Sequence, residues 1–197
     1  MRTTIRSLAF ALPLLTAAAR PTSTEQLALQ PESRIWVEGS STVRSFSCAA
    51  TDVSVLVDTR SPRAIPLLLI GDKQVVAMDV KVPAEKIDCG NGTMNEHMKN
   101  AIKAVENPRI LFRMSTYDIT RSAAGATGTL QGTLELGGVK RPITITTAGR
   151  LDNDMLRVTG SYALQMSDYG LTPPSLMFGR IKVDDKVTVK FDLLLKS

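Results

Sequence analysis

Apolar and polar residues alternate along most of the chain, which is the period expected of a β-strand. Five segments alternate most clearly, each with one apolar face and one mostly polar face. They cover residues 76–82, 110–115, 129–136, 156–166 and 187–196. Less regular patterns predict further strands at residues 34–38, 43–58 and 143–150. The alternation therefore predicts about eight strands, separated by turn sequences such as Gly137-Gly138.

One segment has the period of a helix instead. Between Gly92 and Glu106 the apolar side chains recur at the spacing of one helical face. They are Met94, Met98, Ala101, Ile102 and Val105. His97 lies on the same apolar side, and Pro108 follows where a helix would stop. We expect one amphipathic helix between two strands, long enough to plug or cap one end of a barrel.

The apolar face of an antiparallel sheet must be covered, either by a second sheet or by closure of the sheet on itself. Alternation alone does not decide between a sandwich and a barrel. Nor does it say whether a barrel would be hollow, because a small eight-stranded barrel can fill its interior with its own side chains or hold one ligand.

The first nineteen residues have the pattern of a secretory signal peptide. Arg2 and Arg6 precede an uncharged apolar run at residues 8–15, and small residues at 17–19 precede the expected cleavage point. The apolar run is shorter than the roughly 20 residues of a membrane-spanning helix, and no later run is longer, so we expect no membrane span. We expect a linker at residues 20–33, one domain at 34–197, and a periplasmic or secreted location.

Composition narrows the function classes. The 197 residues are 43% hydrophobic and 22% charged, which excludes a disordered chain and a simple coiled coil. Removal of Arg2 and Arg6 with the signal peptide lowers the net charge from +5 to +3, and the basic residues are scattered, so we expect no nucleic-acid partner. A single histidine and two cysteines are too few for a Cys/His zinc site, and we expect no metal.

The two cysteines, Cys48 and Cys89, are forty-one positions apart. In an exported protein a disulfide between them is the expected state, although two separate buried thiols stay an alternative. The chain has no Cys-x-x-Cys pair, which argues against a redox role.

Seven short motifs, in order along the chain, resemble those of the YceI-like family, which is known for a lipocalin-like barrel that holds long-chain isoprenoid lipids. They are SSTVRSF (40–46), VPAEKID (82–88), MNEHM (94–98), NPRILF (107–112), GTL to GVKRPI (128–143), SDYG (167–170) and VDDKVTV (183–189). The resemblance covers residues 34–196. It implies an all-β fold, an antiparallel lipocalin-like β-barrel of about eight strands with one amphipathic helix.

The chain departs from the family pattern in a few places. Asn95 stands where the family usually has an acidic residue, and Met98 stands where it usually has leucine. The two cysteines are not general family features, and the segment 61–73 matches poorly.

The resemblance implies a non-enzymatic carrier that holds an amphiphilic lipid, a polyisoprenoid or an isoprenoid quinone, in the barrel interior. Apolar burial of the tail would supply roughly 25 cal/mol per Å². Apart from such a lipid we expect no cofactor. The expected lining is Phe46, Met78, Met94, Met98, Ile102, Phe112, Leu134, Tyr162, Leu164, Met166 and Phe178. For the headgroup we expect contacts from Arg44, His97 and Asp168.

Several alternatives stay open. The barrel could be a ligand-free protein-interaction or stress-response module, and it could be a monomer or a homodimer. An enzyme would need His97 as its base, but on an apolar helical face a histidine that packs within the fold is commoner. Asp168 could bond turn amides in place of a ligand, with Gly170 supplying a permissive backbone.

Overall fold

The computed structural model describes residues 24–176 and 178–197. The predicted signal peptide at residues 1–19 lies outside the described residues. Neither helix in the described part of the chain is long and apolar enough to cross a bilayer.

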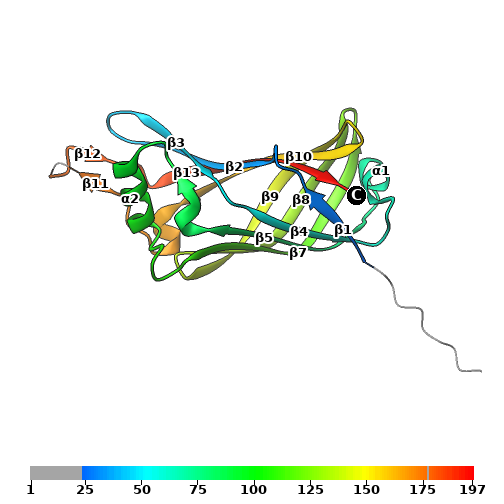
Figure 1. Cartoon of the computed structure of the whole chain (residues 1–197), viewed down its shortest axis with the longest axis horizontal. Coiled ribbons are helices and arrows are strands. Elements are labelled where there is room, and N and C mark those ends of the chain that lie inside the picture. Colours follow the sequence, from blue (N-terminus) through cyan, green and yellow to red (C-terminus); the bar gives the residue numbers. More distant parts are fainter. Residues whose placement is uncertain (1–23, 177) are drawn as a thin grey trace, which may run out of the picture.

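Eight antiparallel strands form a closed ring, which confirms the predicted barrel. In order around the ring they are β1 (Glu25–Leu29), β4 (Ser54–Thr59), β5 (Val75–Pro83), β7 (Arg109–Ser122), β8 (Gly125–Leu136), β9 (Val139–Asp152), β10 (Met155–Gln165) and β13 (Lys186–Lys196). Strand β13 completes the ring by pairing with β1 (Figure 1).

The wall is longer at one end of the barrel, because three further strands continue the sheet from β13. They are β2 (Arg34–Ser40), β3 (Ser45–Ala50) and β6 (Ile87–Asp88). A separate hairpin of β11 (Ser175–Leu176) and β12 (Ile181–Lys182) lies at the same end. Two short 3-10 turns, η1 (Ala84–Lys86) and η2 (Met166–Tyr169), follow β5 and β10.

The prediction of a linker is wrong for residues 25–29, which form β1. This strand pairs with β4 on one side and with the last residues of β13 on the other, and Leu27 is only 3% exposed. Five residues hold too few alternations to stand out in the sequence. The ring nevertheless depends on them, because without β1 the edges of β4 and β13 would be unpaired there.

Residues 43–58 are two strands, not the single strand predicted. Strand β3 pairs with β2 and β6, whereas β4 pairs with β1 and β5. The change of partners occurs at residues 51–53, where the amide of Thr51 donates a 2.8 Å hydrogen bond to the carbonyl of Lys86. The segment 43–58 therefore contributes β3 to the extended part of the wall and β4 to the closed ring.

Irregular pairing changes which side chains face inward. Between β4 and β5, Asp58 pairs with Ala77 and Thr59 with Val75, so Val76 is an extra residue and its side chain is exposed. The prediction that Val76 belongs to the inner face is therefore wrong. A similar shift after Met114 in β7 restores an inward direction at Tyr117, which is buried.

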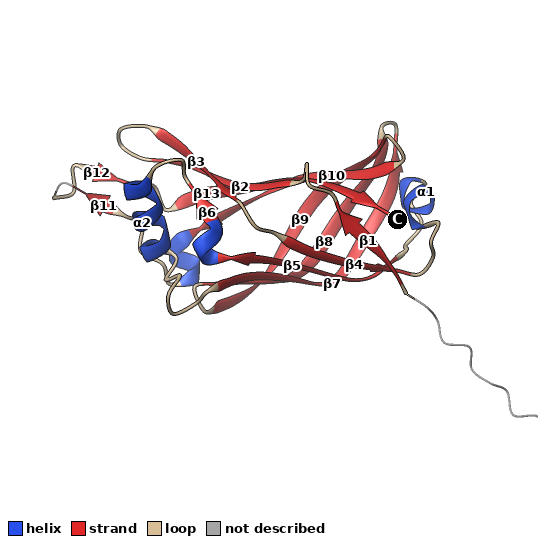
Figure 2. Cartoon of the chain, viewed as in Figure 1, coloured by secondary structure: helices blue, strands red, loops and turns tan. Residues whose placement is uncertain are grey.

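The two helices lie at opposite ends of the barrel (Figures 1 and 2). Helix α2 (Gly92–Ala101) is the predicted helix, but it is shorter than the expected span to Glu106. The backbone turns left-handed at Lys103, with φ of 55°, so Val105 leaves the apolar face and is 90% exposed. Helix α1 (Ala64–Leu69) was not predicted and lies in the segment that matches the family poorly.

Helix α1 closes its end of the barrel with a solid apolar core. Its side chains Ala64, Ile65 and Leu68 are buried among residues of the surrounding strands. Those residues include Leu27, Val55, Val57, Tyr117, Leu156, Leu193 and Leu195. None of the three α1 residues reaches the interior cavity described below.

On the outer face near this end, Arg157 of β10 links two carboxylates. Its guanidinium donates two hydrogen bonds of 2.7 Å to Asp192 of β13 and one of 2.9 Å to Asp152 of β9. The bonds from Arg157 hold the pKa of Asp192 below its ordinary value. The ion pair thus joins β10 to the strand that completes the ring.

We predict that the free energy of unfolding falls less between neutral and acidic pH in Asp192→Asn than in wild type. Because the folded-state pKa of Asp192 is depressed, its contribution is present above the unfolded value of about 3.9 and is lost as the pH falls through the folded value. Urea unfolding at about pH 7 and about pH 3 should show a larger fall in wild type than in the variant. Asp118→Asn is the control, since its pair with Lys73 is surface-exposed. An equal effect of both substitutions would contradict the prediction.

Candidate functional site

The half of the barrel nearer α2 is hollow. A cavity of about 560 Å³ extends between the strands and α2, a size typical of small-molecule sites. Its wall is mostly aliphatic and aromatic, and every long strand of the ring contributes to it. The alternation did not say whether the barrel is hollow or filled. In this half the barrel is hollow, because its own side chains do not fill the interior.

Glycines in the wall help to keep the interior open. Three phenylalanine rings of the lining lie flat over a glycine of the neighbouring strand, so that a Cβ added at that glycine would meet the ring. The pairs are Phe46 over Gly39, Phe112 over Gly132 and Phe191 over Gly160. A ring that lies over a glycine occupies space next to the backbone and projects less into the cavity.

Ten of the eleven predicted lining residues lie on the cavity wall. They are Phe46, Met78, Met94, Met98, Ile102, Phe112, Leu134, Tyr162, Leu164 and Met166. The exception is Phe178, whose predicted place in the lining is wrong. It lies in the turn between β11 and β12 with φ of 54°, and its side chain is fully exposed. Phenylalanine at a turn carries no alternation that would tell inside from outside.

Of the three residues expected to contact the headgroup, two line the cavity and one does not. Arg44 and His97 both line the cavity. Asp168 does not line it, so its predicted place at the site is wrong. Asp168 lies in η2, where its backbone carbonyl accepts a 2.8 Å hydrogen bond from Arg141. Gly170, the residue after η2, is left-handed with φ of 62°, so the permissive backbone of the alternative interpretation is present. Among the described residues, however, the turn amide of Ser167 donates its hydrogen bond to the carboxylate of Asp185 and not to that of Asp168.

Arg44 is presented by the tight turn between β2 and β3. The hydroxyl of Ser41 accepts hydrogen bonds from the amides of Val43 and Arg44 and donates a 2.8 Å bond to the carbonyl of Arg44. Val43 and Arg44 are both exposed and both line the cavity. The cavity therefore reaches the surface at this turn, next to α2.

Charge is scarce in this wall. Arg44 is the one Lys, Arg, Asp or Glu side chain among the described residues that line the cavity. Tyr162 is a further polar group of the lining, and it lies in contact with the core around Tyr169. Burial raises the pKa of Tyr169 to about 12.

Helix α2 forms the wall next to the opening, with Met94, His97 and Met98 on its inner side. The side chain of Asn91 caps its first turn by accepting a 3.2 Å hydrogen bond from the amide of Met94. No residue of α2 is fully buried. The helix therefore covers the cavity without being embedded in the core.

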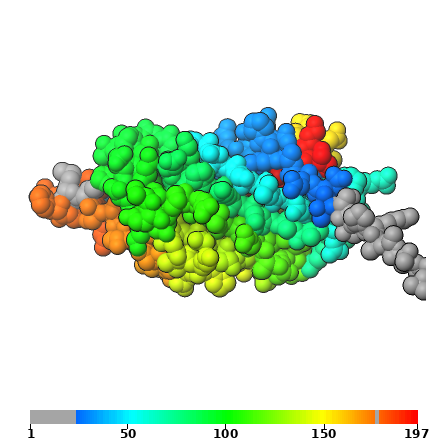
Figure 3. All heavy atoms as spheres, turned by 60° about the horizontal axis from the view of Figure 1, so that its bottom comes forward, coloured from blue at the N-terminus to red at the C-terminus, as the bar shows by residue number. Residues whose placement is uncertain are grey.

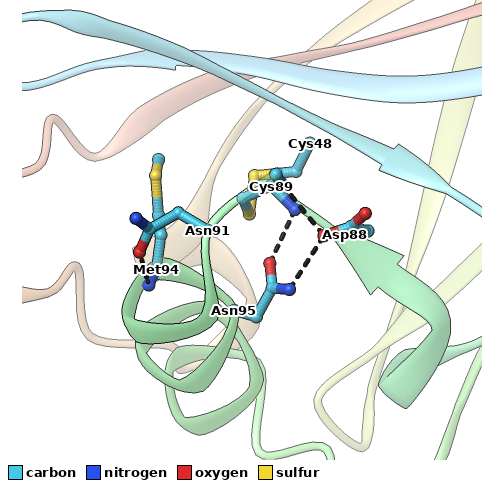
Figure 4. Close-up of a disulfide and its surroundings, with 7 residues drawn as sticks. Cys48, Asp88, Cys89, Asn91, Met94 and Asn95 are labelled. Atoms are coloured by element: carbon cyan, nitrogen blue, oxygen red, sulfur yellow. Dashed lines mark hydrogen bonds between the residues drawn. A yellow bond between two sulfur atoms is a disulfide. The ribbon is translucent and has the colours of Figure 1, made fainter.

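A disulfide holds the start of α2 against the wall, which confirms the predicted pairing of Cys48 with Cys89 (Figure 4). Asn95 reaches back to the same segment. Its Oδ1 accepts a 2.6 Å bond from the amide of Cys89, and its Nδ2 donates a 2.8 Å bond to Asp88. The bond from Asn95 Nδ2, together with one from the amide of Gly90, lowers the pKa of Asp88. An acidic side chain at position 95 would lack the amide N–H that bonds Asp88.

Comparison with known proteins identifies the family of the chain. Residues 36–195 match the model of the YceI-like domain. The chain belongs to the YceI-like family. No curated protein matched the sequence.

Solved structures share the fold of this YceI-like chain. The Burkholderia cenocepacia protein BcnA is 17% identical, with a TM-score of 0.64 over 82% of this chain and 95% of that chain. A YceI protein of Campylobacter jejuni is 17% identical, with a TM-score of 0.56 over 76% and 84%. A polyisoprenoid binding domain from Saccharophagus degradans, implicated in plant cell wall breakdown, is 12% identical, with a TM-score of 0.56 over 87% and 97%.

Sequence reasoning missed part of the lining of this YceI-like barrel. Val80 and Phe191 lie on alternating faces that were recognised, so the alternation itself could have found them. Ser41, Asn91 and Pro174 lie in loops or at a helix cap and have no periodic signal. Periodicity therefore predicts the residues at the rim of the cavity less well than those on its strands.

We predict that Gly39→Ala narrows the cavity. The new methyl group would meet the ring of Phe46 and push it inward. Such overpacking lowers the free energy of unfolding by roughly 1–3 kcal/mol. Urea unfolding and uptake of a fluorescent apolar probe are the measurements. Gly149→Ala is the matched control, because its Cβ would make only ordinary van der Waals contacts, at 3.6 Å from the side chain of Leu156 and 3.9 Å from the carbonyl oxygen of Ala126. Equal probe uptake by wild type and both variants would show that the glycine does not set the width.

We predict that the double variant Cys48→Ala/Cys89→Ala is less stable by about 4 kcal/mol, as expected for freeing a loop of this length in the unfolded chain. Urea unfolding measures this loss, and wild type with reductant should behave like the variant. Because the bond holds the segment before α2, amide exchange in α2 should accelerate more than in β8. Unchanged unfolding free energy would contradict the prediction.

Proposed function

We propose that this YceI-like protein binds and carries an amphiphilic lipid, with the apolar tail in the barrel cavity. The observation that supports this most directly is the cavity of about 560 Å³, which has an almost wholly apolar wall and reaches the surface beside Arg44. Apolar burial drives such binding at roughly 25 cal/mol per Å² of surface removed from water. A structure that shares the fold, from Saccharophagus degradans, is described as a polyisoprenoid binding domain, which supports the proposal.

The headgroup would lie at the α2 end. Arg44 and His97 are the groups of the lining suited to hydrogen-bond an oxygen-bearing head, and both are near the surface there. The tail would extend toward the solid core around α1. A polyisoprenoid or an isoprenoid quinone, which joins a small polar head to a long branched tail, fits this division of the interior.

The proposed function is binding without catalysis. Both cysteines are used in the disulfide, so a Cys–His pair is not available. Within the described residues, the side chain of His97 has no hydrogen bond to a serine or a carboxylate that would orient it as a base. The methionines around it, Met94 and Met98, suit contact with a flexible apolar chain.

A periplasmic or secreted location belongs to the same proposal. The disulfide between Cys48 and Cys89 fits an oxidising compartment. Such a location would place the carrier outside the cytoplasm, where a long isoprenoid chain cannot cross water between membranes unaided.

We predict that the protein purified from its own host carries a lipid detectable by native mass spectrometry, and that Val189→Trp reduces this load. Val189 lines the cavity, and an indole there would displace part of the tail, with affinity falling on the order of tenfold for each ~55 Å² of apolar surface that stays in water. Ser161→Trp is the control, since this neighbouring side chain points outward and is exposed. Repeatedly empty spectra with no uptake of added isoprenoids would favour a ligand-free interaction module instead.

A further inference from the structure

Two loops lie side by side at the open end of the barrel. The amide of Thr42, in the β2–β3 turn, donates a 3.0 Å bond to the carbonyl of Lys182 in β12, and its hydroxyl donates a 3.1 Å bond to the carbonyl of Arg180. Ser41 also forms a bridge with Val183. We call residues 41–44 together with residues 178–183 the tip. In the space-filling view the orange hairpin projects beyond α2 (Figure 3).

The tip exposes apolar side chains where a soluble surface would bury or omit them. Val43 is 66% exposed at the β2–β3 turn, and Phe178 is fully exposed in the hairpin turn. A left-handed backbone is strained for phenylalanine, yet Phe178 adopts it with φ of 54° and packs against nothing that would bury it. Both side chains belong to projecting turns.

The tip is also basic. Arg44, Arg180 and Lys182 are exposed, and no ion pair of the described residues involves them. Residues 39–51 and 172–183 contain no aspartate or glutamate. Asp184 directly follows this segment, and its carboxylate accepts a hydrogen bond from the hydroxyl of Ser40. Three cations that form no ion pair among the described residues thus lie around exposed apolar side chains, and such a surface suits a partner with negative charge outside an apolar interior.

We propose that the tip docks the open end of the barrel on an anionic lipid bilayer. Phe178 and Val43 enter the interfacial region, while Arg180 and Lys182 contact lipid phosphates. A bilayer fits better than a protein, because two protruding side chains and three cations fall far short of the roughly 800 Å² per partner of a stable protein interface. The proposal extends the function proposed above, but docking does not require a lipid in the cavity.

The tip lies at the opening of the cavity. Val43, Ile181 and Val183 belong to the tip and also line the cavity. A tip seated in the headgroup layer therefore brings the opening of the cavity against the bilayer. A lipid tail could then move between membrane and barrel with little exposure to water.

Vesicle co-sedimentation of the purified protein tests the proposal. Wild type should bind vesicles containing phosphatidylglycerol better than vesicles of phosphatidylcholine alone, and added salt should weaken the binding. Phe178→Ser should lower vesicle affinity roughly tenfold or more, and Arg180→Gln/Lys182→Gln should lower it roughly thirtyfold. None of these three residues lines the cavity, so lipid content by native mass spectrometry should stay unchanged.

Matched controls lie at the α1 end. Leu151→Ser removes another exposed apolar side chain, and Arg121→Gln/Lys196→Gln removes two exposed cations. These variants should bind vesicles like wild type. Equal losses in tip and control variants, or no vesicle binding by wild type, would overturn the proposal. If wild type ignores vesicles and Phe178→Ser converts a dimer to a monomer in light scattering, the tip is an interface between two copies instead.

Discussion

Burial of one apolar sheet face is the constraint on which the rest of this structure depends. Strands that are apolar on one side only cannot remain an open sheet in water, and here the sheet closes on itself. Closure requires a strand that can pair on both sides at the seam. The five residues of β1 do this by joining β4 to the end of β13, so a small segment near the N-terminus controls whether the whole inner face is covered.

Closure alone would not make a cavity, since a barrel of this size can fill itself. The two ends solve the packing differently. Around α1, leucine, valine and isoleucine side chains meet in the middle and leave no access from that helix to the cavity. Nearer α2, glycines let aromatic rings such as Phe46 and Phe191 lie against the wall, and a helix without fully buried residues replaces a packed core. The barrel thus has a solidly packed half at α1 and a hollow half at α2.

Much of this was predictable because alternation reports directly on burial. The long strands, the inward methionines and the disulfide followed from period, spacing and compartment. The failures have physical causes as well. A bulge turned Val76 outward, a left-handed residue at Lys103 ended α2 early, and α1 is a single short turn-like helix without a long apolar face. Asn95 acts through its amide at a loop, where no periodic pattern exists.

The solid core around α1 has a consequence for what the barrel would accept. A hollow that is open at one end and blocked at the other acts as a ruler, because a chain that enters can advance only until it reaches the blocked end. Molecules too short for this depth would leave part of the apolar wall unfilled, and longer ones would keep part of the tail outside. Length discrimination would then come from the position of one six-residue helix, without any contact that reads chemical identity.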